Sequence, residues 1–314
     1  MNKNHHIFVL FFLKYSCNQQ IFCNFAGQMC LSIKVHNQLL DLSSPQVMAI
    51  VNITPDSFYT AWGQLSEDAL LAQVQSAINQ GARILDIGAC STRPDSTPAD
   101  EHTEWLRLQP ALQAIRTHFP TIALSVDTFR ANIAQQALEL GADIINDISG
   151  GADKRMWEVL ANHHAPYILT YAQDIPAASA NYDNTMSCML DFFQKRLNNL
   201  HRMGIADVIL DPGFGFCKTL EQNYTILRQL DILSVLHAPI LVGISRKSML
   251  YKPLDATPAD VLAATTAAHT IALERGAHIL RVHDVAAAQQ AIKIFQLTHH
   301  SCCTLKGSND CLTD

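Results

Sequence analysis

Residues 240–248 read Ile-Leu-Val-Gly-Ile-Ser-Arg-Lys-Ser, an apolar run that stops at two adjacent cations. An apolar run without polar alternation is typical of a strand buried on both faces, as the strands of a parallel sheet are. Arg246 and Lys247 follow this run directly, so a buried strand would bring both cations to one edge of the sheet. The stretch therefore predicts a parallel sheet with polar residues at the carboxyl ends of its strands.

The same pattern recurs along the chain, because other apolar runs also end in polar residues. The residues that follow these runs are Ser91, Thr92 and Arg93, then Asp127, Asn146 and Asp147, Asp211, and finally Arg281, His283 and Asp284. In a parallel sheet the carboxyl ends of the strands share one edge, which is where ligands bind in such folds. We therefore expect these side chains to face a common site.

Strand-like and helix-like segments alternate after an expected hairpin at residues 32–42. Strands are expected at 47–52, 83–88, 122–127, 143–148, 167–171, 208–211, 240–244 and 278–282. Helices are expected at 67–80, 99–118, 130–140, 154–163, 185–203, 220–235, 259–275 and 286–297. Thr257, Pro258 and Asp260 are typical of a helix start, with a hydroxyl N-cap, a proline in the first turn and a carboxylate at the third position. Glycines are expected as left-handed C-caps at Gly81, Gly141, Gly204 and Gly276.

The succession of segments predicts an α/β fold of the (β/α)8 TIM-barrel type, with a short N-terminal β-hairpin. Eight βα units in about 250 residues fit a closed parallel barrel, whose chemistry lies at the carboxyl ends of the strands. A doubly wound open sheet is the alternative, but it usually has fewer strands and one glycine-rich turn.

Length and composition favour a single large domain. The chain has 314 residues and is 48% hydrophobic, which is enough for one large core. Residues 29–300 are expected to form the barrel, and residues 301–314 a polar tail. Residues 1–28 are expected to be upstream sequence wrongly included or a disordered extension, because a second methionine, Met29, begins a more ordinary sequence. The apolar run at 7–13 is too short to span a bilayer, and a weak export signal is the alternative.

Charge and cysteine usage restrict the partners and the compartment. The net charge of −6 argues against a nucleic-acid or anionic-membrane surface. The nine cysteines show no metal-type spacing and no regular framework, so we expect free thiols in a reducing cytoplasm. Neither a Gly-x-Ser-x-Gly elbow nor a P-loop occurs in the sequence.

One set of strand-end residues suits a flat heterocycle. Asp127, Asn146, Asp211 and Lys247 combine carboxylates, an amide and an ammonium. A carboxylate accepts hydrogen bonds, an amide both donates and accepts, and a lysine donates to a ring oxygen or nitrogen. A fused ring with an amidine-like edge and a carbonyl group would satisfy all of them. The alternative is a set of buried ion pairs that stabilise the barrel core.

A second, cationic set suits phosphate. It comprises Arg93, Lys218, Arg246, Arg281 and His283, to which Asn52, Ser91 and Thr92 add polar groups. Arginine forks match phosphate oxygens, and a metal ion commonly shares the charge. Phe214 and Phe216, in a glycine-rich turn, would form an apolar wall for a ring, although a core role for one of them is equally compatible.

Taken together, the motifs resemble those of the dihydropteroate synthase family, the sulfonamide target of the folate pathway. The resemblance is carried by Val-Met-Ala-Ile-Val-Asn-Ile-Thr-Pro-Asp-Ser-Phe (47–58), Asp-Ile-Gly (86–88), Ser-Thr-Arg-Pro (91–94), Ser-Val-Asp-Thr (125–128), Ile-Ile-Asn-Asp-Ile (144–148), Asp-Pro-Gly-Phe-Gly-Phe (211–216), Ser-Arg-Lys-Ser (245–248) and Arg-Val-His-Asp (281–284). These motifs follow the family order over almost all of residues 29–297. No single motif suffices, but the set is highly specific.

The resemblance implies a homodimeric transferase that joins 6-hydroxymethyl-7,8-dihydropterin diphosphate to 4-aminobenzoate with the help of Mg2+. It implies that Asp127, Asn146, Asp211 and Lys247 bind the pterin and that Arg281 packs beside it, with Lys247, Asp127 and Arg281 as the catalytic residues. Asn52 would meet the metal and diphosphate, and Thr92, Arg93 and His283 would meet diphosphate oxygens. Pro94, Phe216 and Ser245 would border the aminobenzoate.

The chain also departs from the family pattern at several places. Residues 59–63 replace the usual Ser-Asp-Gly-Gly, Ala89 and Cys90 replace Gly-Glu, Tyr171 replaces a histidine, and Cys217 replaces a glycine. Two alternatives therefore stay open. One is a paralogue that binds a pterin diphosphate without efficient condensation, and the other is a pterin-dependent methyltransferase barrel.

Overall fold

The computed structural model describes residues 31–36, 38–53, 66–90, 99–173 and 182–299. The chain divides into two units, Met1–Leu31 and Ser32–Asp314, and the description concerns the second. The expected extension at 1–28 and the tail at 301–314 lie outside the described residues. Among the helices of the described part, none combines the length and the apolar character that a membrane span requires.

Eight parallel strands form one sheet, in the order β8-β7-β6-β5-β4-β3-β10-β9. They are β3 (Gln46–Asn52), β4 (Ile84–Gly88), β5 (Ala123–Asp127), β6 (Ile144–Asp147), β7 (Tyr167–Thr170), β8 (Val208–Asp211), β9 (Leu241–Val242) and β10 (Ile279–Val282). A parallel bridge between Leu210 and Ile240 joins the two end strands of this order. The sheet therefore closes into a barrel, as predicted, and the open-sheet alternative is wrong.

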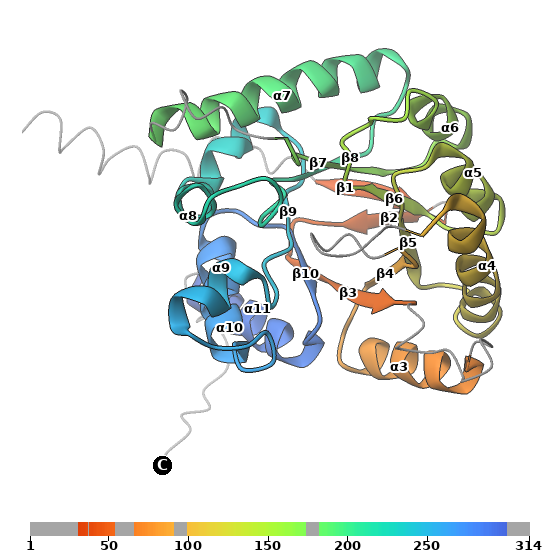
Figure 1. Cartoon of the computed structure of the whole chain (residues 1–314), viewed down its shortest axis with the longest axis horizontal. Coiled ribbons are helices and arrows are strands. Elements are labelled where there is room, and N and C mark those ends of the chain that lie inside the picture. The colour runs from red at the N-terminus through yellow and green to blue at the C-terminus, as the bar shows by residue number, and fades with distance from the viewer. Residues whose placement is uncertain (1–30, 37, 54–65, 91–98, 174–181, 300–314) are drawn as a thin grey trace, which may run out of the picture. The chain divides into compact units, whose positions relative to one another are not determined.

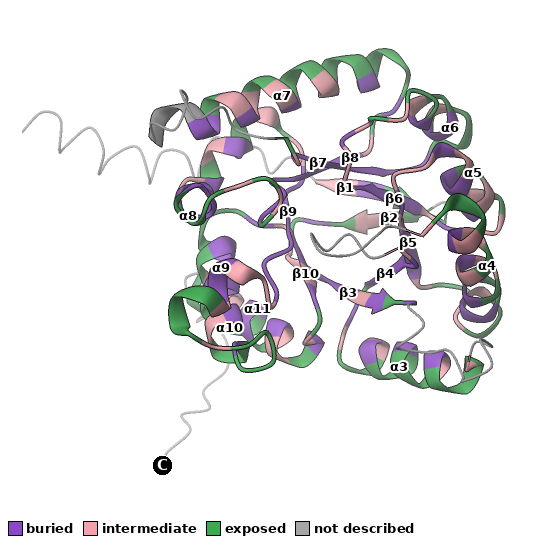
Figure 2. Ribbon diagram, in the orientation of Figure 1, coloured by how far each residue is buried: buried purple, intermediate pink, exposed green. Residues whose placement is uncertain are grey.

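Helices surround the strands and turn their apolar faces toward them (Figures 1 and 2). They are α3 (Glu67–Asn79), α4 (Glu101–His118), α5 (Ala131–Glu139), α6 (Met156–His163), α7 (Tyr182–Arg202), α8 (Leu220–Arg228), α10 (Leu262–Glu274) and α11 (Val285–His299). The strands are short and almost wholly buried, because helices cover their outer faces and the barrel interior covers the others. The four predicted C-cap glycines all have positive φ angles, which confirms the predicted helix ends.

Residues 240–248 are less regular than expected. The strand predicted at 240–244 is reduced to β9, because the chain turns at once: Lys247 N donates to Ile244 O over 3.0 Å. Arg246 has a φ of 57°, a left-handed conformation that ends any extended run. The turn leads into two short helices that were not predicted, α9 (Ser248–Tyr251) and η3 (Lys252–Leu254).

Two helix predictions need correction. Helix α10 begins at Leu262 rather than 259, and its N-cap is Val261. Thr257 and Asp260 form a separate turn instead, in which the Asp260 carboxylate accepts from Thr257 Oγ1 over 2.5 Å. The helix predicted at 220–235 is α8 followed by a 3-10 helix, η2 (Leu230–Leu236).

The predicted hairpin lies at the amino-terminal end of the barrel. Strands β1 (Ser32–Val35) and β2 (Gln38–Asp41) pair antiparallel. His36, in the connection between them, contacts Asp143 with 3.1 Å between Nδ1 and Oδ1. Asp143 also accepts from Arg116 over 2.5 Å, so this end of the barrel has an ion-pair cluster of its own.

Candidate functional site

The side chains predicted to share the barrel mouth come from five strands or the turns that follow them. Asp127, Asn146 and Asp211 lie at the ends of β5, β6 and β8, Lys247 follows β9, and Arg281 belongs to β10. Asp127 and Asn146 are register partners on neighbouring strands. Hydrogen bonds connect Asp127, Asn146 and Arg281 through Asp86, and the charges of Asp211 and Lys247 act on Arg281 and Asp127.

A buried carboxylate, Asp86 in the middle of β4, connects several of the predicted site residues. It accepts hydrogen bonds from Ser125 Oγ at 2.6 Å, Asn146 Nδ2 at 3.0 Å and Arg281 Nε at 2.6 Å. Arg281 Nη2 in turn donates to Asp127 over 2.7 Å. The guanidinium is therefore held between two carboxylates, and the whole group is oriented from the barrel interior.

Burial and charge oppose one another in this group. Burial lowers the pKa of Arg281, but Asp86 and Asp127 outweigh that effect and raise it above its ordinary value. Burial raises the pKa of Asp127 to about 7, although the Arg281 charge acts in the opposite direction. The site therefore keeps a permanent cation beside a carboxylate that titrates near neutral pH.

The side-chain carbonyl oxygen of Asn146 is available to a ligand. Its Nδ2 is occupied by Asp86, while its buried Oδ1 has no hydrogen-bond partner among the described residues. An unpaired buried carbonyl oxygen costs free energy of about 1–3 kcal/mol. A ligand with an N–H group at this position would remove that cost.

Asp211 and Lys247 form the other half of the mouth. Asp211 Oδ1 accepts from Gly213 N over 2.8 Å, and burial raises its pKa while the Lys247 charge opposes the rise. Burial lowers the pKa of Lys247 to about 8. The ammonium donates to Phe214 O and lies 4.2 Å from the centre of the Phe216 ring.

The turn after β8 is shaped to admit Lys247. A Cβ atom on Gly215 would lie 3.1 Å from Lys247 Cδ, and Gly215 has a positive φ of 79°. Phe214 is fully buried in the core, whereas Phe216 is half-buried under the lysine. Of the two phenylalanines predicted to form an apolar wall, only Phe216 therefore borders the mouth.

Lys218 and Arg246, both considered for phosphate, are engaged elsewhere. Lys218 Nζ donates to three carbonyl oxygens, those of Tyr171 at 2.7 Å, Gly213 at 2.8 Å and Phe216 at 3.0 Å. Arg246 forms a bidentate pair with Asp284, with distances of 2.9 and 2.5 Å. These contacts favour structural roles for both cations.

Ser245 and His283 lie side by side at the rim of the barrel. Ser245 Oγ is 3.0 Å from His283 Nδ1, and His283 N donates to the same hydroxyl oxygen over 3.3 Å. Ser245 is buried and His283 is exposed. The pair presents a hydroxyl and an imidazole between β9 and β10.

Asn52 ends β3 with an exposed side chain. A Cβ atom built on Gly88 would lie 3.8 Å from Asn52 Oδ1 and 3.4 Å from Asp127 Cβ, so the amide borders the same mouth. Within the described residues, no group of three or more His, Cys, Asp or Glu side chains is placed to hold a metal ion. A single amide oxygen nevertheless fits Mg2+, which usually takes few protein oxygens and completes its shell with substrate phosphates and water.

Some of the remaining predicted site residues, and some of the positions at which the chain differs from the family pattern, are not described by the structure. Thr92, Arg93 and Pro94, like residues 59–63, lie outside the described residues. Tyr171 is buried, and its ring packs on helix α7, 5.0 Å from the Phe192 ring centre. The described cysteines, Cys90, Cys188 and Cys217, are free thiols, as expected.

Sequence reasoning missed Asp86 as a site residue. The prediction considered only polar residues at strand ends. Asp86 instead lies in the middle of β4, within a strand that is otherwise apolar. A charged residue inside a fully buried strand is rare unless it is paired. The carboxylate of Asp86 inside an otherwise apolar strand was therefore the sequence signal that could have identified it as a site residue.

Comparisons with known proteins identify relatives of the whole barrel. Residues 48–283 match the family model described as "Pterin binding enzyme". The chain is 37% identical over 273 residues to a dihydropteroate synthase of Haemophilus influenzae, covering 85% of this chain and 99% of the relative.

Solved structures match at the level of the fold and the sequence. A dihydropteroate synthase of Xanthomonas albilineans with 4-aminobenzoic acid superposes with a TM-score of 0.79 at 32% identity, covering 86% of this chain and 98% of the other. A dihydropteroate synthase of Yersinia pestis in complex with a sulfonamide drug gives a TM-score of 0.79 at 36% identity, covering 86% and 100% of the two chains.

Proposed function

Because the chain belongs to the dihydropteroate synthase family of pterin-binding transferases, we propose that its barrel mouth joins 6-hydroxymethyl-7,8-dihydropterin diphosphate to 4-aminobenzoate. The products are 7,8-dihydropteroate and diphosphate. The observation that carries the proposal is the buried chain of Asp127, Arg281, Asp86 and Asn146, which ends in an acceptor that has no partner in the described part of the chain. A flat ring with several N–H groups is the ligand that this arrangement suits.

The pterin ring binds between the two halves of the mouth. Asp211 and Asn146 Oδ1 accept from N–H groups of its amidine-like edge, Lys247 donates to a ring oxygen or nitrogen, and Asp127 accepts from the remaining ring N–H. Arg281 packs beside the ring, held in place by Asp86 and Asp127. Each contact uses a group that the fold has already oriented, so little is lost in ordering the site.

Condensation needs no side-chain nucleophile. The bond between the pterin methylene carbon and the diphosphate oxygen breaks first, and the electron pair leaves with the diphosphate. The cation that remains is stabilised by the electron-rich ring and by the carboxylates of Asp127 and Asp211. The arylamine nitrogen then attacks the methylene carbon and loses a proton to the released diphosphate or to water.

The leaving group and the second substrate occupy the rim. His283, Thr92 and Arg93 meet diphosphate oxygens, and Ser245, Phe216 and Pro94 border the aminobenzoate. Asn52 would hold Mg2+, and the ion would supply charge neutralisation for the diphosphate. The family resemblance also implies a homodimer, and we propose that this chain forms one.

The test is product formation by the purified protein given both substrates and Mg2+, with dihydropteroate and diphosphate measured separately. Equal amounts of the two products are expected. Diphosphate without dihydropteroate would favour the impaired paralogue, and methyl transfer from a methylated pterin would favour the methyltransferase alternative.

The pocket assignment is tested by binding in the same preparation. We expect Lys247→Ala and Asp211→Asn each to weaken the affinity for the pterin by at least about tenfold, or about 1.4 kcal/mol. Lys252→Ala, an exposed lysine five residues further on, is the matched control and should bind like the parent. Parent-like binding by either of the first two variants would overturn the assignment.

A further inference from the structure

Strand β9, the shortest of the barrel, is followed by a lysine of the mouth. It has only two residues, Leu241 and Val242, which pair in parallel with Ile279 and Leu280 of β10. Lys247 comes after these pairs, beyond a turn. The backbone ladder therefore ends before the ammonium that borders the mouth, so other contacts must hold the turn that carries it.

Two side-chain contacts continue the register of β9 and β10 beyond the ladder. In the ladder, β9 pairs with residues 38 positions later in the chain, and the same separation joins Ser245 to His283 and Arg246 to Asp284. Ser245 Oγ lies 3.0 Å from His283 Nδ1, and the Arg246 guanidinium donates to both oxygens of Asp284, over 2.9 and 2.5 Å. The turn after β9 thus stays aligned with the turn after β10 through its side chains.

The conformation of Arg246 needs support from its surroundings. Its φ of 57° lies in the left-handed region, which is unfavourable for a residue other than glycine and persists only where other contacts impose it. Besides the pair with Asp284, the N–H of Arg246 donates to Thr265 Oγ1 of helix α10 over 3.4 Å. The residues on either side of Arg246 are Ser245 and Lys247, so a change in its conformation would move two side chains of the mouth.

Asp284 binds this arginine rather than its own helix. It directly precedes α11, and its carbonyl oxygen accepts from Ala288 N over 3.2 Å, a position at which an aspartate side chain commonly caps the first N–H groups of the helix. The carboxylate accepts from Arg246 instead, and the N–H of Ala286 donates to Gln80 Oε1 over 3.2 Å. A local cap would stabilise the helix, so the contact with another turn indicates a role in positioning.

The pair is better suited to fixing geometry than to stabilising the fold. The side chains of Arg246 and Asp284 are 37% and 23% exposed, and solvent weakens the attraction between charges at such positions. Two parallel hydrogen bonds between one guanidinium and one carboxylate nevertheless fix the orientation of both side chains. Burial lowers the pKa of His269 of α10 to about 4, so this histidine is neutral and Arg246 is the cation that neutralises Asp284.

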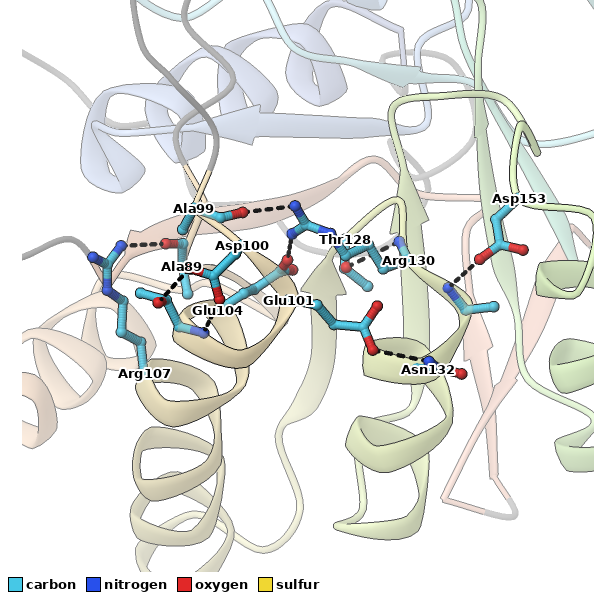
Figure 3. A network of polar contacts seen from close by, with 12 residues as sticks. Ala89, Ala99, Asp100, Glu101, Glu104, Arg107, Thr128, Arg130, Asn132 and Asp153 are labelled. Atoms are coloured by element: carbon cyan, nitrogen blue, oxygen red, sulfur yellow. Dashed lines mark hydrogen bonds and ion pairs between the residues drawn. The ribbon is translucent and has the colours of Figure 1, made fainter.

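Helix α4 takes part in arginine contacts of a different kind (Figure 3). Arg130, which follows β5, pairs with Glu104 of α4, and its Nη2 donates to the carbonyl oxygen of Ala99 over 2.6 Å. Arg107 of α4 donates to the carbonyl oxygen of Ala89 over 3.1 Å. These arginines bind carbonyl oxygens of the backbone, whereas the pair between the turns after β9 and β10 joins two side chains in register.

We propose that Arg246 and Asp284 are positioning residues, which keep the turn after β9 in register with β10 and so hold Lys247 in the mouth. The pair touches no ligand and acts through the two neighbours of Arg246, Ser245 and Lys247. This inference rests on the proposed function, because that function assigns Lys247 to the pterin ring and Ser245 to the aminobenzoate.

The experiment measures, by calorimetry, the affinity for a pterin that lacks the diphosphate. It compares Arg246→Met, Arg246→Gly and Asp284→Asn with the control Arg275→Met, which removes an exposed pair with Asp231. We expect at least about tenfold weaker binding in the first three variants, because the Lys247 ammonium loses its place beside the ring, and parent-like binding in the control.

Two further variants separate positioning from stability. Glycine accepts a left-handed φ without strain, so Arg246→Gly removes the pair while it relieves the turn, and it replaces Arg246→Met if that variant fails to fold. The double variant Arg246→Met/Asp284→Asn should bind the pterin no more weakly than either single variant, because two residues that act as one unit do not have additive effects. Additive losses would contradict a role as a pair.

A second readout needs no ligand. Burial lowers the pKa of both Lys247 and Lys218 to about 8, and 13C NMR of labelled lysine side chains follows each titration, with signals assigned from Lys247→Ala and Lys218→Met. The charges of Asp211, Arg281 and Asp127 act on Lys247 and remain in every variant that lacks the pair. When the turn loses its register, the ammonium gains water, and the pKa of Lys247 should rise toward the ordinary 10.5. Lys218 is the internal reference and should not change.

Parent-like titration of Lys247 in both Arg246 variants would overturn the inference. A loss of affinity restricted to the pterin diphosphate would also overturn it, because Arg246 would then be a phosphate ligand. If the parent itself binds no pterin, the proposed function fails, and the titration of Lys247 alone decides whether the pair holds this lysine in place.

Discussion

Asp86 is the residue on which the geometry of the mouth depends most. It accepts from donors on three other strands, namely Ser125, Asn146 and Arg281. Several hydrogen-bond donors stabilise a buried carboxylate. Replacing Asp86 with an amide would leave Arg281 with one carboxylate partner, Asp127, and would turn one acceptor atom into a donor. Asp86 therefore acts on a ligand through the two side chains that it orients.

The first residue-scale prediction concerns Asp86→Asn. We expect pterin affinity to fall at least about tenfold, or about 1.4 kcal/mol, measured by calorimetry, because Asn146 and Arg281 lose their common acceptor. Asp143→Asn is the matched control, because Asp143 is also a carboxylate buried against an arginine, Arg116, at the opposite end of the barrel. The control should lose stability but retain pterin affinity. Equal losses of affinity in the two variants would contradict the positioning role of Asp86.

The second residue-scale prediction concerns pH. Burial raises the pKa of Asp127 to about 7 and lowers the pKa of Lys247 to about 8. The pterin is bound by the ionised acid and the protonated amine, so affinity should rise as pH increases through about 7 and fall above about 8. Calorimetry with a pterin that lacks the diphosphate avoids titration of the phosphate groups. Asp127→Asn should remove the acid-side limb, and a profile with both limbs intact in that variant would contradict the assignment.

At the scale of elements, the turn between β8 and α8 shows why a cation is not always a ligand. Gly213 has a φ of 67°, and a Cβ atom there would lie 2.2 Å from Tyr171 O, so the turn packs directly on the end of β7. Lys218 satisfies the carbonyl oxygens that this close approach brings together. The ammonium closes the turn from inside and holds Phe216 at the mouth.

The element-scale prediction is a stability loss in Lys218→Met. Three carbonyl oxygens lose their charged donor, and the free energy of unfolding in urea should fall by about 2–4 kcal/mol. The exposed Lys252→Met is the control and should change stability by less than about 0.5 kcal/mol. A weaker affinity for diphosphate at unchanged stability would instead restore Lys218 to the phosphate-binding set.

At the scale of the whole molecule, barrel closure brings distant parts of the sequence together. The bridge between Leu210 and Ile240 closes the ring, and β10 pairs with β3, so Arg281 reaches Asp86 across 195 positions of sequence. The two ends of the barrel have separate ion pairs. His36 of the hairpin contacts Asp143 at the amino-terminal end, and Arg281 pairs with Asp86 and Asp127 at the mouth. That residues 29–300 form one domain stays a prediction.

The amino-acid sequence by itself determined the order and type of the barrel strands and of the main helices between them, because burial on both faces leaves a clear apolar signature in each strand and the glycine C-caps mark the helix ends. It also predicted a polar site at the strand ends, of which Asp127, Asn146 and Arg281 are joined through hydrogen bonds. Helix α10 was misjudged, since Thr257 and Asp260 satisfy each other in a turn and local hydrogen bonds of this kind compete with helix formation. Only the tertiary structure decided the partners: that Asp86 orients the site, that Lys218 serves the backbone, and that Arg130 and Arg107 hold Ala99 and Ala89. Those contacts join segments far apart in the chain, and a local pattern carries no information about which charge will meet which.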